Sequence, residues 1–396
     1  MLLVQTVIRR GCRNSGYSLK RNINGSAHLS YYINHHHSNT KNLSPSSTSI
    51  AINNNNNNNN NYRNYSFSTS IAVRTMVTIN NSFLVNHTCL RIKDPKSVDW
   101  WQEKIGMKLI ATIPFDTFTL YMLNYETEKN KHLNWAAREG VLELCYNHGG
   151  TEEINNGNGD KDKGFGHVCI SVDNIEAAQE QFLANGVRFK KKLSDGRQHN
   201  IAFLLSDPED YWIEVIENGI DKQENKTEIS SYKLNHTMVR VKDPEVSLKF
   251  YRSLGFKLFS KKDFPEAKFS LYFLGYNHDA NFKEGTMSWE EQSKRESILE
   301  LTHNWGTESD SSFKGYHNGN STENGEVQGY GHICISCEDP GKFCQELEQA
   351  YGDKLDWSVK FNQGSAVKGI AFIRDPDTYS IEILSHDLFK DRMGKL

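Results

Sequence analysis

Short apolar runs, each followed by a helical pattern, recur along most of this chain. One run starts at His87, and the residues after it, Ser97–Ile105, have apolar side chains at helical spacing. A second run starts at His167 and is followed by the helical pattern of Ile175–Ala184. Segments rich in β-forming residues come next, namely Phe118–Leu123, Val141–Tyr146, Ile201–Leu205 and Trp212–Ile216. The pattern predicts a βαβββ module.

The same order of motifs returns in the second half of the chain. Asn86–Pro95 returns as Asn235–Pro244, and Gly164–Ser171 returns as Gly329–Ser336. Such self-similarity indicates an internal duplication. We therefore predict an α+β fold with four βαβββ modules in two tandem domains. The predicted boundaries are 80–220 and 230–388 for the domains and 221–229 for a polar linker.

Every module places a His on its first strand and a Glu on its last. The pairs are His87 and Glu143, His167 and Glu214, His236 and Glu300, and His332 and Glu382. A carboxylate among apolar strand residues is costly to bury unless it is paired or bound to a cation, and four repetitions favour a metal over satisfied core residues. Two modules supply two imidazoles and two carboxylates, so four modules predict two sites. This ligand set suits zinc, nickel, cobalt, iron or manganese without choosing among them.

The first 75 residues differ from the rest of the chain. Residues 1–75 contain no Asp or Glu, carry a net charge of about +8 and include the tract Asn53–Asn61. This composition predicts disorder, and an Arg- and Ser-rich, acid-free leader is typical of a mitochondrial transit peptide. The leader therefore predicts a protein of the mitochondrial matrix. The alternative is a low-complexity extension with translation starting at Met76, which predicts a cytoplasmic protein.

The remaining chain is mildly acidic, near −11, and has no basic stripe, which argues against nucleic-acid binding. No apolar run approaches the ~18 residues that span a bilayer, so we predict a soluble protein without membrane partners. The seven cysteines fit a reducing compartment. Cys334 and Cys337 form a CxxC motif, but residues three apart on a strand point to opposite faces, so both are predicted to be buried structural residues.

Longer stretches resemble glyoxalase I of the vicinal-oxygen-chelate superfamily, across nearly all of 80–388. The most specific are Phe264–Leu274, Leu299–Glu308 and Tyr316–Asn320. The tandem arrangement resembles the fused, two-domain form known from fungi. The resemblance implies a lactoylglutathione lyase that converts the hemithioacetal of methylglyoxal and glutathione into S-lactoylglutathione and so detoxifies methylglyoxal. It implies one divalent metal per site, with Zn²⁺ favoured over Ni²⁺ or Co²⁺, and a monomer with two intramolecular sites.

The resemblance also implies that each site combines halves of both domains. The first site would contain His236, Glu300, His167 and Glu214, and the second site His87, Glu143, His332 and Glu382. Glu214 and Glu382 match the glutamate that moves a proton between the two hemithioacetal carbons, with Glu300 and Glu143 as the opposing carboxylates. The residues implied to bind glutathione are Arg240, Asn304, Lys163 and Lys191 at the first site, and Arg91, Asn147 and Lys360 at the second.

The second site departs from the family pattern around its ligands. Gln328 stands where an Arg is common, and Tyr146–Gly149 replaces the usual Thr-His-Asn-Trp-Gly. The last strand reads Tyr379-Ser380-Ile381-Glu382, where a Trp often precedes the Ile-Glu pair. Since all eight ligand positions are filled, both sites are expected to work, with unequal affinity or rate.

Three other functions fit the same fold class, because fold alone does not decide chemistry. A ring-cleaving dioxygenase would hold iron by two His and one carboxylate, and the second Glu at each site counts against it. A ligand-sequestering protein of the antibiotic-resistance type would need neither metal nor base. A degenerate scaffold would not retain eight intact ligands.

Overall fold

Four βαβββ modules follow one another along the chain, as the sequence pattern predicts. The computed structural model describes residues 77–150, 153–160, 162–320, 328–364 and 367–390, so the leader with its predicted transit peptide lies outside the described residues. The first module consists of β1 (Leu84–Ile92), α1 (Lys96–Ile105), β2 (Lys108–Pro114), β3 (Phe118–Asn124) and β4 (Val141–Asn147). The second consists of β5 (Phe165–Val172), α2 (Ile175–Ala184), β6 (Arg188–Lys191), β7 (Ala202–Leu205) and β8 (Trp212–Glu217).

The third and fourth modules repeat this order. The third consists of β9 (Lys233–Val241), α3 (Pro244–Ser253), β10 (Lys257–Phe264), β11 (Phe269–Gly275), the short helix α4 (Trp289–Ser293) and β12 (Ile298–Asn304). The fourth consists of β13 (Tyr330–Cys337), α5 (Pro340–Tyr351), β14 (Asp356–Val359), β15 (Ile370–Arg374) and β16 (Ser380–Ser385). Short 3₁₀ turns lie at η1 (Trp135–Ala137), η2 (Ile229–Ser231) and η4 (Gly352–Lys354). Among the described residues no helix has both the length and the apolar character needed to cross a membrane.

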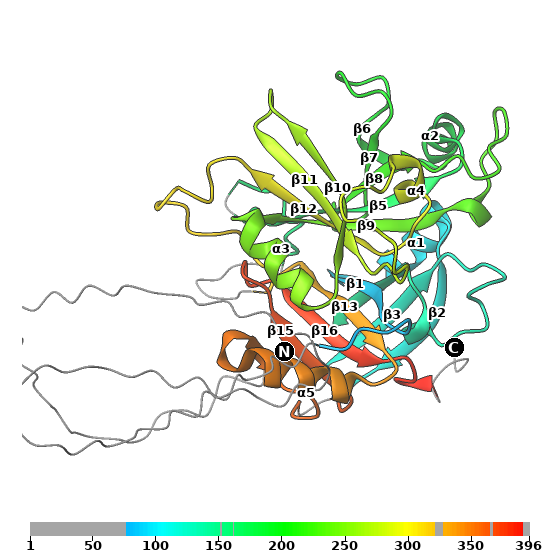
Figure 1. Ribbon diagram of the computed structural model, residues 1–396. Coiled ribbons are helices and arrows are strands. Elements are labelled where there is room, and N and C mark those ends of the chain that lie inside the picture. The colour runs from blue at the N-terminus through cyan, green and yellow to red at the C-terminus, as the bar shows by residue number, and fades with distance from the viewer. Residues whose placement is uncertain (1–76, 151–152, 161, 321–327, 365–366, 391–396) are drawn as a thin grey trace, which may run out of the picture. The chain divides into compact units, whose positions relative to one another are not determined.

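The strands form two eight-stranded sheets, and each sheet takes one module from each half of the chain (Figure 1). One sheet has the order β14-β15-β16-β13-β1-β4-β3-β2, which joins the fourth module to the first. The other has the order β10-β11-β12-β9-β5-β8-β7-β6, which joins the third module to the second. The modules meet through the antiparallel pairs β1–β13 and β5–β9 at the centre of each sheet. This is the exchange of halves that the family resemblance implies.

The two faces of each sheet have different apolar clusters. The large core lies on the face covered by the helices, where Val98, Trp101 and Ile105 of α1 pack with strand residues such as Leu90. Smaller clusters lie on the opposite face of each sheet. Cys337 belongs to the large core and Cys334 to a small cluster, and both are buried free thiols. The CxxC pair therefore points to opposite faces, as its strand spacing predicts.

Candidate metal centres

The eight predicted ligand residues come together as two groups of four, and all of them are buried except the half-buried His332. One group is His87, Glu143, His332 and Glu382, and the other is His167, Glu214, His236 and Glu300. Within each group one ligand atom from every residue lies within 4.8 Å of the others. Each group takes two residues from each half of the chain, in the combinations that the resemblance implies for the second and first sites.

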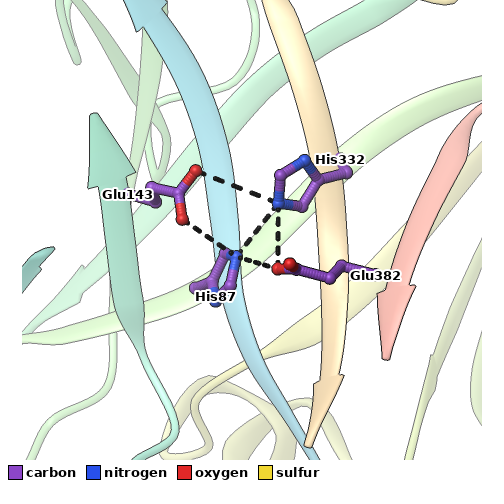
Figure 2. A group of neighbouring side chains, drawn as sticks. All are labelled: His87, Glu143, His332 and Glu382. Atoms are coloured by element: carbon purple, nitrogen blue, oxygen red, sulfur yellow. Dashed lines mark hydrogen bonds and ion pairs between the residues drawn. The ribbon is translucent and has the colours of Figure 1, made fainter. Parts of the chain in front are cut away.

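At the second site the four side chains converge on one point (Figure 2). The Nε2 atom of His87 lies 3.4 Å from Oε2 of Glu143 and 3.2 Å from Oε2 of Glu382. The Nε2 atom of His332 lies 3.4 Å from Oε2 of Glu382 and 3.1 Å from Nε2 of His87. Two imidazole nitrogens facing each other at this distance, with carboxylates on both sides, form a donor set that suits one cation between them.

The first site repeats this geometry. The Nε2 atom of His236 lies 3.0 Å from Oε2 of Glu214 and 3.0 Å from Oε2 of Glu300. The Nε2 atom of His167 lies 3.4 Å from Oε2 of Glu214 and 3.2 Å from Nε2 of His236. The pseudo-symmetry of the sheets thus produces two alike centres in one chain.

The central strands explain why these side chains meet. In the second site's sheet, β1 lies between β13 and β4, and β13 lies between β1 and β16. The parallel pairs place Glu143 beside Cys89, and Glu382 beside Cys334. Since alternate residues on a strand share a face, His87 and Glu143 project from the same face as His332 and Glu382. Each His is thereby brought toward two carboxylates.

An asparagine orients one histidine at each site, a feature that the sequence reasoning missed. Nδ1 of His87 lies 2.6 Å from Oδ1 of Asn86, and Nδ1 of His236 lies 2.8 Å from Oδ1 of Asn235. The amide nitrogen of Asn86 donates to the carbonyl oxygens of Trp135 and Arg138, so its oxygen must face the ring. The ring then donates from Nδ1 and keeps Nε2 free to bind a cation. The Asn-His pair recurs in both halves of the sequence and was the available signal.

Two carboxylates are held in their ionised form. Burial raises the pKa of Glu382, but hydrogen bonds and charge from His332 and His87 outweigh it and bring the pKa to about 2. The same balance, with His167 and His236, lowers the pKa of Glu214 below its usual value. A divalent cation bound at either centre would be compensated by the carboxylates among its four ligands.

The two predicted arginines lie beside the centres and bind backbone. Arg91 donates to the carbonyl oxygen of Tyr330 at 3.0 Å and to Oδ1 of Asn320 at 2.6 Å. Arg240 donates to the carbonyl oxygen of Phe165 at 3.1 Å and, at 3.0 Å, to Oδ1 of the Asn158 side chain. These bonds fix the loop that leads into β13 or β5 against the neighbouring strand. Their predicted contact with glutathione stays a prediction.

The other predicted substrate residues are placed less uniformly. Nζ of Lys191 donates to the carbonyl oxygens of Gln198 and Ile201, and burial lowers its pKa while the charge of Glu214 opposes the shift. Lys163 lies 3.8 Å from Asp160, and Lys360 lies 3.2 Å from Glu348, both pairs being exposed to solvent. Asn304 donates to the Tyr316 hydroxyl, and Asn147 ends β4 with its side chain exposed. Lys191 is within electrostatic reach of the metal-centre carboxylate of Glu214, and Arg240 is within reach of Glu300.

The sequence departures at the second site have structural counterparts. At the first site Trp305 donates from its indole nitrogen to Ser270, and at the second its counterpart His148 has Nε2 2.8 Å from the Thr119 hydroxyl. Trp212 packs on Phe203 with ring centroids 5.8 Å apart, and its counterpart at the second site is Ser380. The second site therefore lacks the aromatic support of Trp212, and an imidazole replaces the indole of Trp305.

Comparison with known proteins finds one family along both halves. Residues 84–215 and 233–383 match the Glyoxalase/Bleomycin resistance protein/Dioxygenase superfamily. The chain is 48% identical over 321 residues to a glyoxalase I of Saccharomyces cerevisiae, covering 78% of this chain and 94% of the relative. It is 42% identical over 313 residues to a lactoylglutathione lyase of Schizosaccharomyces pombe, covering 77% and 97%. A crystal structure of glyoxalase I from Zea mays has a similar fold, with 23% identity, a TM-score of 0.56 and coverage of 78% and 95%.

Proposed function

The chain belongs to the glyoxalase I (lactoylglutathione lyase) family, and we propose that it isomerises the hemithioacetal of methylglyoxal and glutathione to S-lactoylglutathione at two metal centres. The observation that carries this proposal is the pair of four-residue groups, each with two imidazoles and two carboxylates. The second carboxylate separates these groups from the two-His, one-carboxylate set of an iron dioxygenase.

The chemistry needs a base and a place for negative charge. The proton to be moved is α to a carbonyl and weakly acidic, so a positioned carboxylate and electrostatic stabilisation are both required. A divalent ion held by the four side chains would supply Lewis-acid stabilisation of the charge that develops on the substrate oxygens. Zn²⁺ is the proposed ion, with Ni²⁺ and Co²⁺ as alternatives, since the donor set accepts each of them.

Glu214 and Glu382 are the proposed bases. Both are buried, and both have pKa values held below the usual range by the neighbouring histidines, so they are ionised at neutral pH. Each takes the proton from one hemithioacetal carbon and returns it to the next. Glu300 and Glu143 lie across the centre as the opposing carboxylates.

The test is thioester formation, followed by ultraviolet absorbance after methylglyoxal and glutathione are mixed with the full chain. Turnover should disappear on chelation and return when a divalent metal is added. Zn²⁺, Ni²⁺ and Co²⁺ added separately would identify the preferred ion. A folded, metal-loaded protein without turnover would contradict the proposal and favour the dioxygenase or binding-protein functions.

We also propose that the protein is a monomer of the mitochondrial matrix. Each centre is completed within one chain, so no second copy is needed. The acid-free, Arg-rich composition of residues 1–75 supports import. Light scattering of the purified protein tests the first statement. Import of the chain into isolated mitochondria, with loss of the leader, tests the second, and a cytoplasmic distribution would contradict it.

A further inference from the structure

Each metal centre is bordered by an apolar wall on the ligand-bearing face of its sheet. Register shows which residues share this face, because Met122 pairs with Glu143, Phe372 with Glu382 and Phe273 with Glu300. The wall of the second site contains Ile113, Met122, Trp135 and Ile370, with Phe372, Leu388 and Phe389 packed against them. The wall of the first site contains Phe259, Phe273 and Ile298, with Leu271, Phe282 and Met287 packed against them.

The second wall is closed by the chain segment that follows β16. The amide nitrogen of Asn134 donates to the carbonyl oxygens of His386 at 2.6 Å and Leu388 at 3.1 Å, which fixes this segment beside Trp135. Leu388 and Phe389 then pack into the wall, and the ring of Phe389 lies edge-on to Phe115 with centroids 6.0 Å apart. Trp135 itself is 2% exposed, with its ring 5.9 Å from that of His87.

At the first site the corresponding segment takes another course. The backbone N–H of His386 donates to the carbonyl oxygen at the end of β13, and that of Asn218 donates to the carbonyl oxygen at the end of β5. The segments that follow β16 and β8 therefore start alike. The Asn218 side chain then donates to Ser171 and to the carbonyl oxygen of Ser231, and the chain continues into the linker. Ile220, the counterpart of Leu388, is not part of the first wall.

The outer end of the first wall is bordered by a charged side chain instead. Phe264 stacks on Phe269 as Phe115 stacks on Phe118, but the group over its ring is the exposed Lys262 ammonium, 5.1 Å away. Gln292 has the position at the first site that Trp135 has at the second. The backbone carbonyl of Trp135 accepts a hydrogen bond from the Asn86 side chain, and that of Gln292 accepts one from the Asn235 side chain.

An aromatic side chain in contact with the first wall is about half exposed. Trp289 lies edge-on to Phe273 with centroids 6.3 Å apart and is 45% exposed. Phe273 in turn lies 5.6 Å from the ring of His236. Aromatic side chains thus lead from the metal centre to the half-exposed Trp289 at the first site, whereas the partly buried Leu388 and Phe389 cover the end of the second wall.

We propose that the two centres select hemithioacetals by the size of the carbon substituent, the first accepting aryl groups and the second admitting only small alkyl groups such as methyl. This rests on the proposed function. The substituent is the apolar end of the substrate, so it lies against the apolar wall beside the metal. A phenyl group can stack on Phe273 and Trp289 at the first site. At the second site it must displace Leu388 and Phe389 from a packed cluster.

Single-site variants of the full chain test this selectivity. Glu382→Gln leaves the first site active and Glu214→Gln leaves the second. For each, kcat/KM is measured with the glutathione hemithioacetals of methylglyoxal and phenylglyoxal. The phenyl-to-methyl ratio should be at least ~10-fold higher for Glu382→Gln, in line with the discrimination that one apolar contact provides. Equal ratios in two active variants would overturn the selectivity and leave the function intact.

Opening the second wall should then change its preference. Phe389→Ala in the Glu214→Gln background should raise the phenyl-to-methyl ratio several-fold, and Phe389→Val provides the same test if the alanine variant does not fold. The matched control is Ile220→Ala in the Glu382→Gln background, which should leave its ratio unchanged. An unchanged ratio in both folded Phe389 variants would overturn the proposal. Absence of turnover by the metal-loaded parent chain would instead overturn the proposed function itself.

Discussion

At the scale of single residues, the sequence predicts the ligands better than their supports. The His and Glu of each module are visible because they repeat four times. The orienting residues Asn86 and Asn235 precede only two of the four histidines, and the sequence pattern alone assigns no role to them. Their role depends on which way a buried amide points, and that is set by the carbonyls of Trp135 and Arg138 or their counterparts, far along the chain.

Removing one of these asparagines should weaken one centre alone. In Asn86→Ala the His87 ring loses the acceptor that fixes its Nδ1 proton, so metal affinity at the second site should fall ~10–100-fold. Calorimetric titration of the metal-free protein should then resolve one tight and one weak site. Asn235→Ala is the mirror control and should weaken the first site instead. Two unchanged affinities would show that the amide does not orient the ring.

A buried hydrogen bond joins the two sheets between the centres. The hydroxyls of Thr88 and Thr237 lie 2.5 Å apart, next to His87 and His236, and both residues are buried. Thr88→Val leaves the other hydroxyl without this partner, so we expect a loss of ~1–3 kcal/mol in the free energy of unfolding. The double variant with Thr237→Val should lose less than the sum, because no polar group is then left unpaired. Urea unfolding measures both, and additive losses would contradict the expectation.

At the scale of elements, periodicity predicts the regular segments closely. Helix α2 has the predicted bounds, and α1 begins one residue earlier than predicted. Strands β3, β4 and β8 each extend one residue beyond the prediction. The turn η1, the helix α4 and the segment after β16 were not predicted, because each is short and is held by tertiary bonds such as those of Asn134.

Gly164 and Gly329 mark places where loops cross closely before the central strands β5 and β13. Gly329 bridges to Asn155, and a Cβ on Gly329 would lie 1.8 Å from the Asn155 carbonyl oxygen. Gly329→Ala should therefore separate the two loops and reduce the free energy of unfolding by ~2 kcal/mol or more. Gly159→Ala is the matched control, since nothing lies within 4 Å of its added Cβ. Thermal unfolding of both variants tests this, and equal midpoints would contradict the close approach.

At the scale of the whole molecule, the local pattern could predict four modules but not their partners. Any two modules could in principle supply two His and two Glu, and only the family resemblance implied that the first pairs with the fourth. The structure has this pairing because β1 and β13, like β5 and β9, meet at the sheet centres. The asymmetry of the two walls follows from what comes after β8 and β16, a linker in one case and the C-terminal segment in the other.

Metal binding should contribute strongly to the stability of the whole molecule. Each centre brings two carboxylates and two imidazoles together, and a bound cation would interact with all four side chains. We expect two divalent ions per chain by elemental analysis, and chelation should lower the melting temperature by several degrees, since ligand binding to the folded state stabilises by mass action. One ion per chain would contradict the presence of two sites.

The double variant Glu214→Gln/Glu382→Gln should lose turnover ~100-fold or more, because both proposed bases are then removed.

Carboxylates at the contact between the sheets should make stability depend on pH. Asp375, 4% exposed, accepts hydrogen bonds from the Tyr251 hydroxyl and from backbone N–H groups, but burial raises its pKa to about 7. Burial also raises the pKa of Asp377 to about 6. A carboxyl group with a raised pKa in the folded state binds its proton more tightly there than when unfolded. Its stabilisation is complete below the unfolded pKa, near 4, and is lost as pH rises through the folded pKa.

The free energy of unfolding should therefore fall between pH 5 and pH 8, by an amount on the order of 1 kcal/mol for each unit of pKa shift. The bases Glu214 and Glu382 act in the opposite direction and below this window, because their pKa values are lowered. Asp375→Asn removes the titrating group, so the fall should become shallower while the value at pH 8 increases. Urea unfolding at pH 5, 6.5 and 8 measures both curves. The same slope in the two proteins would show that Asp375 is ionised in the folded state well below pH 7.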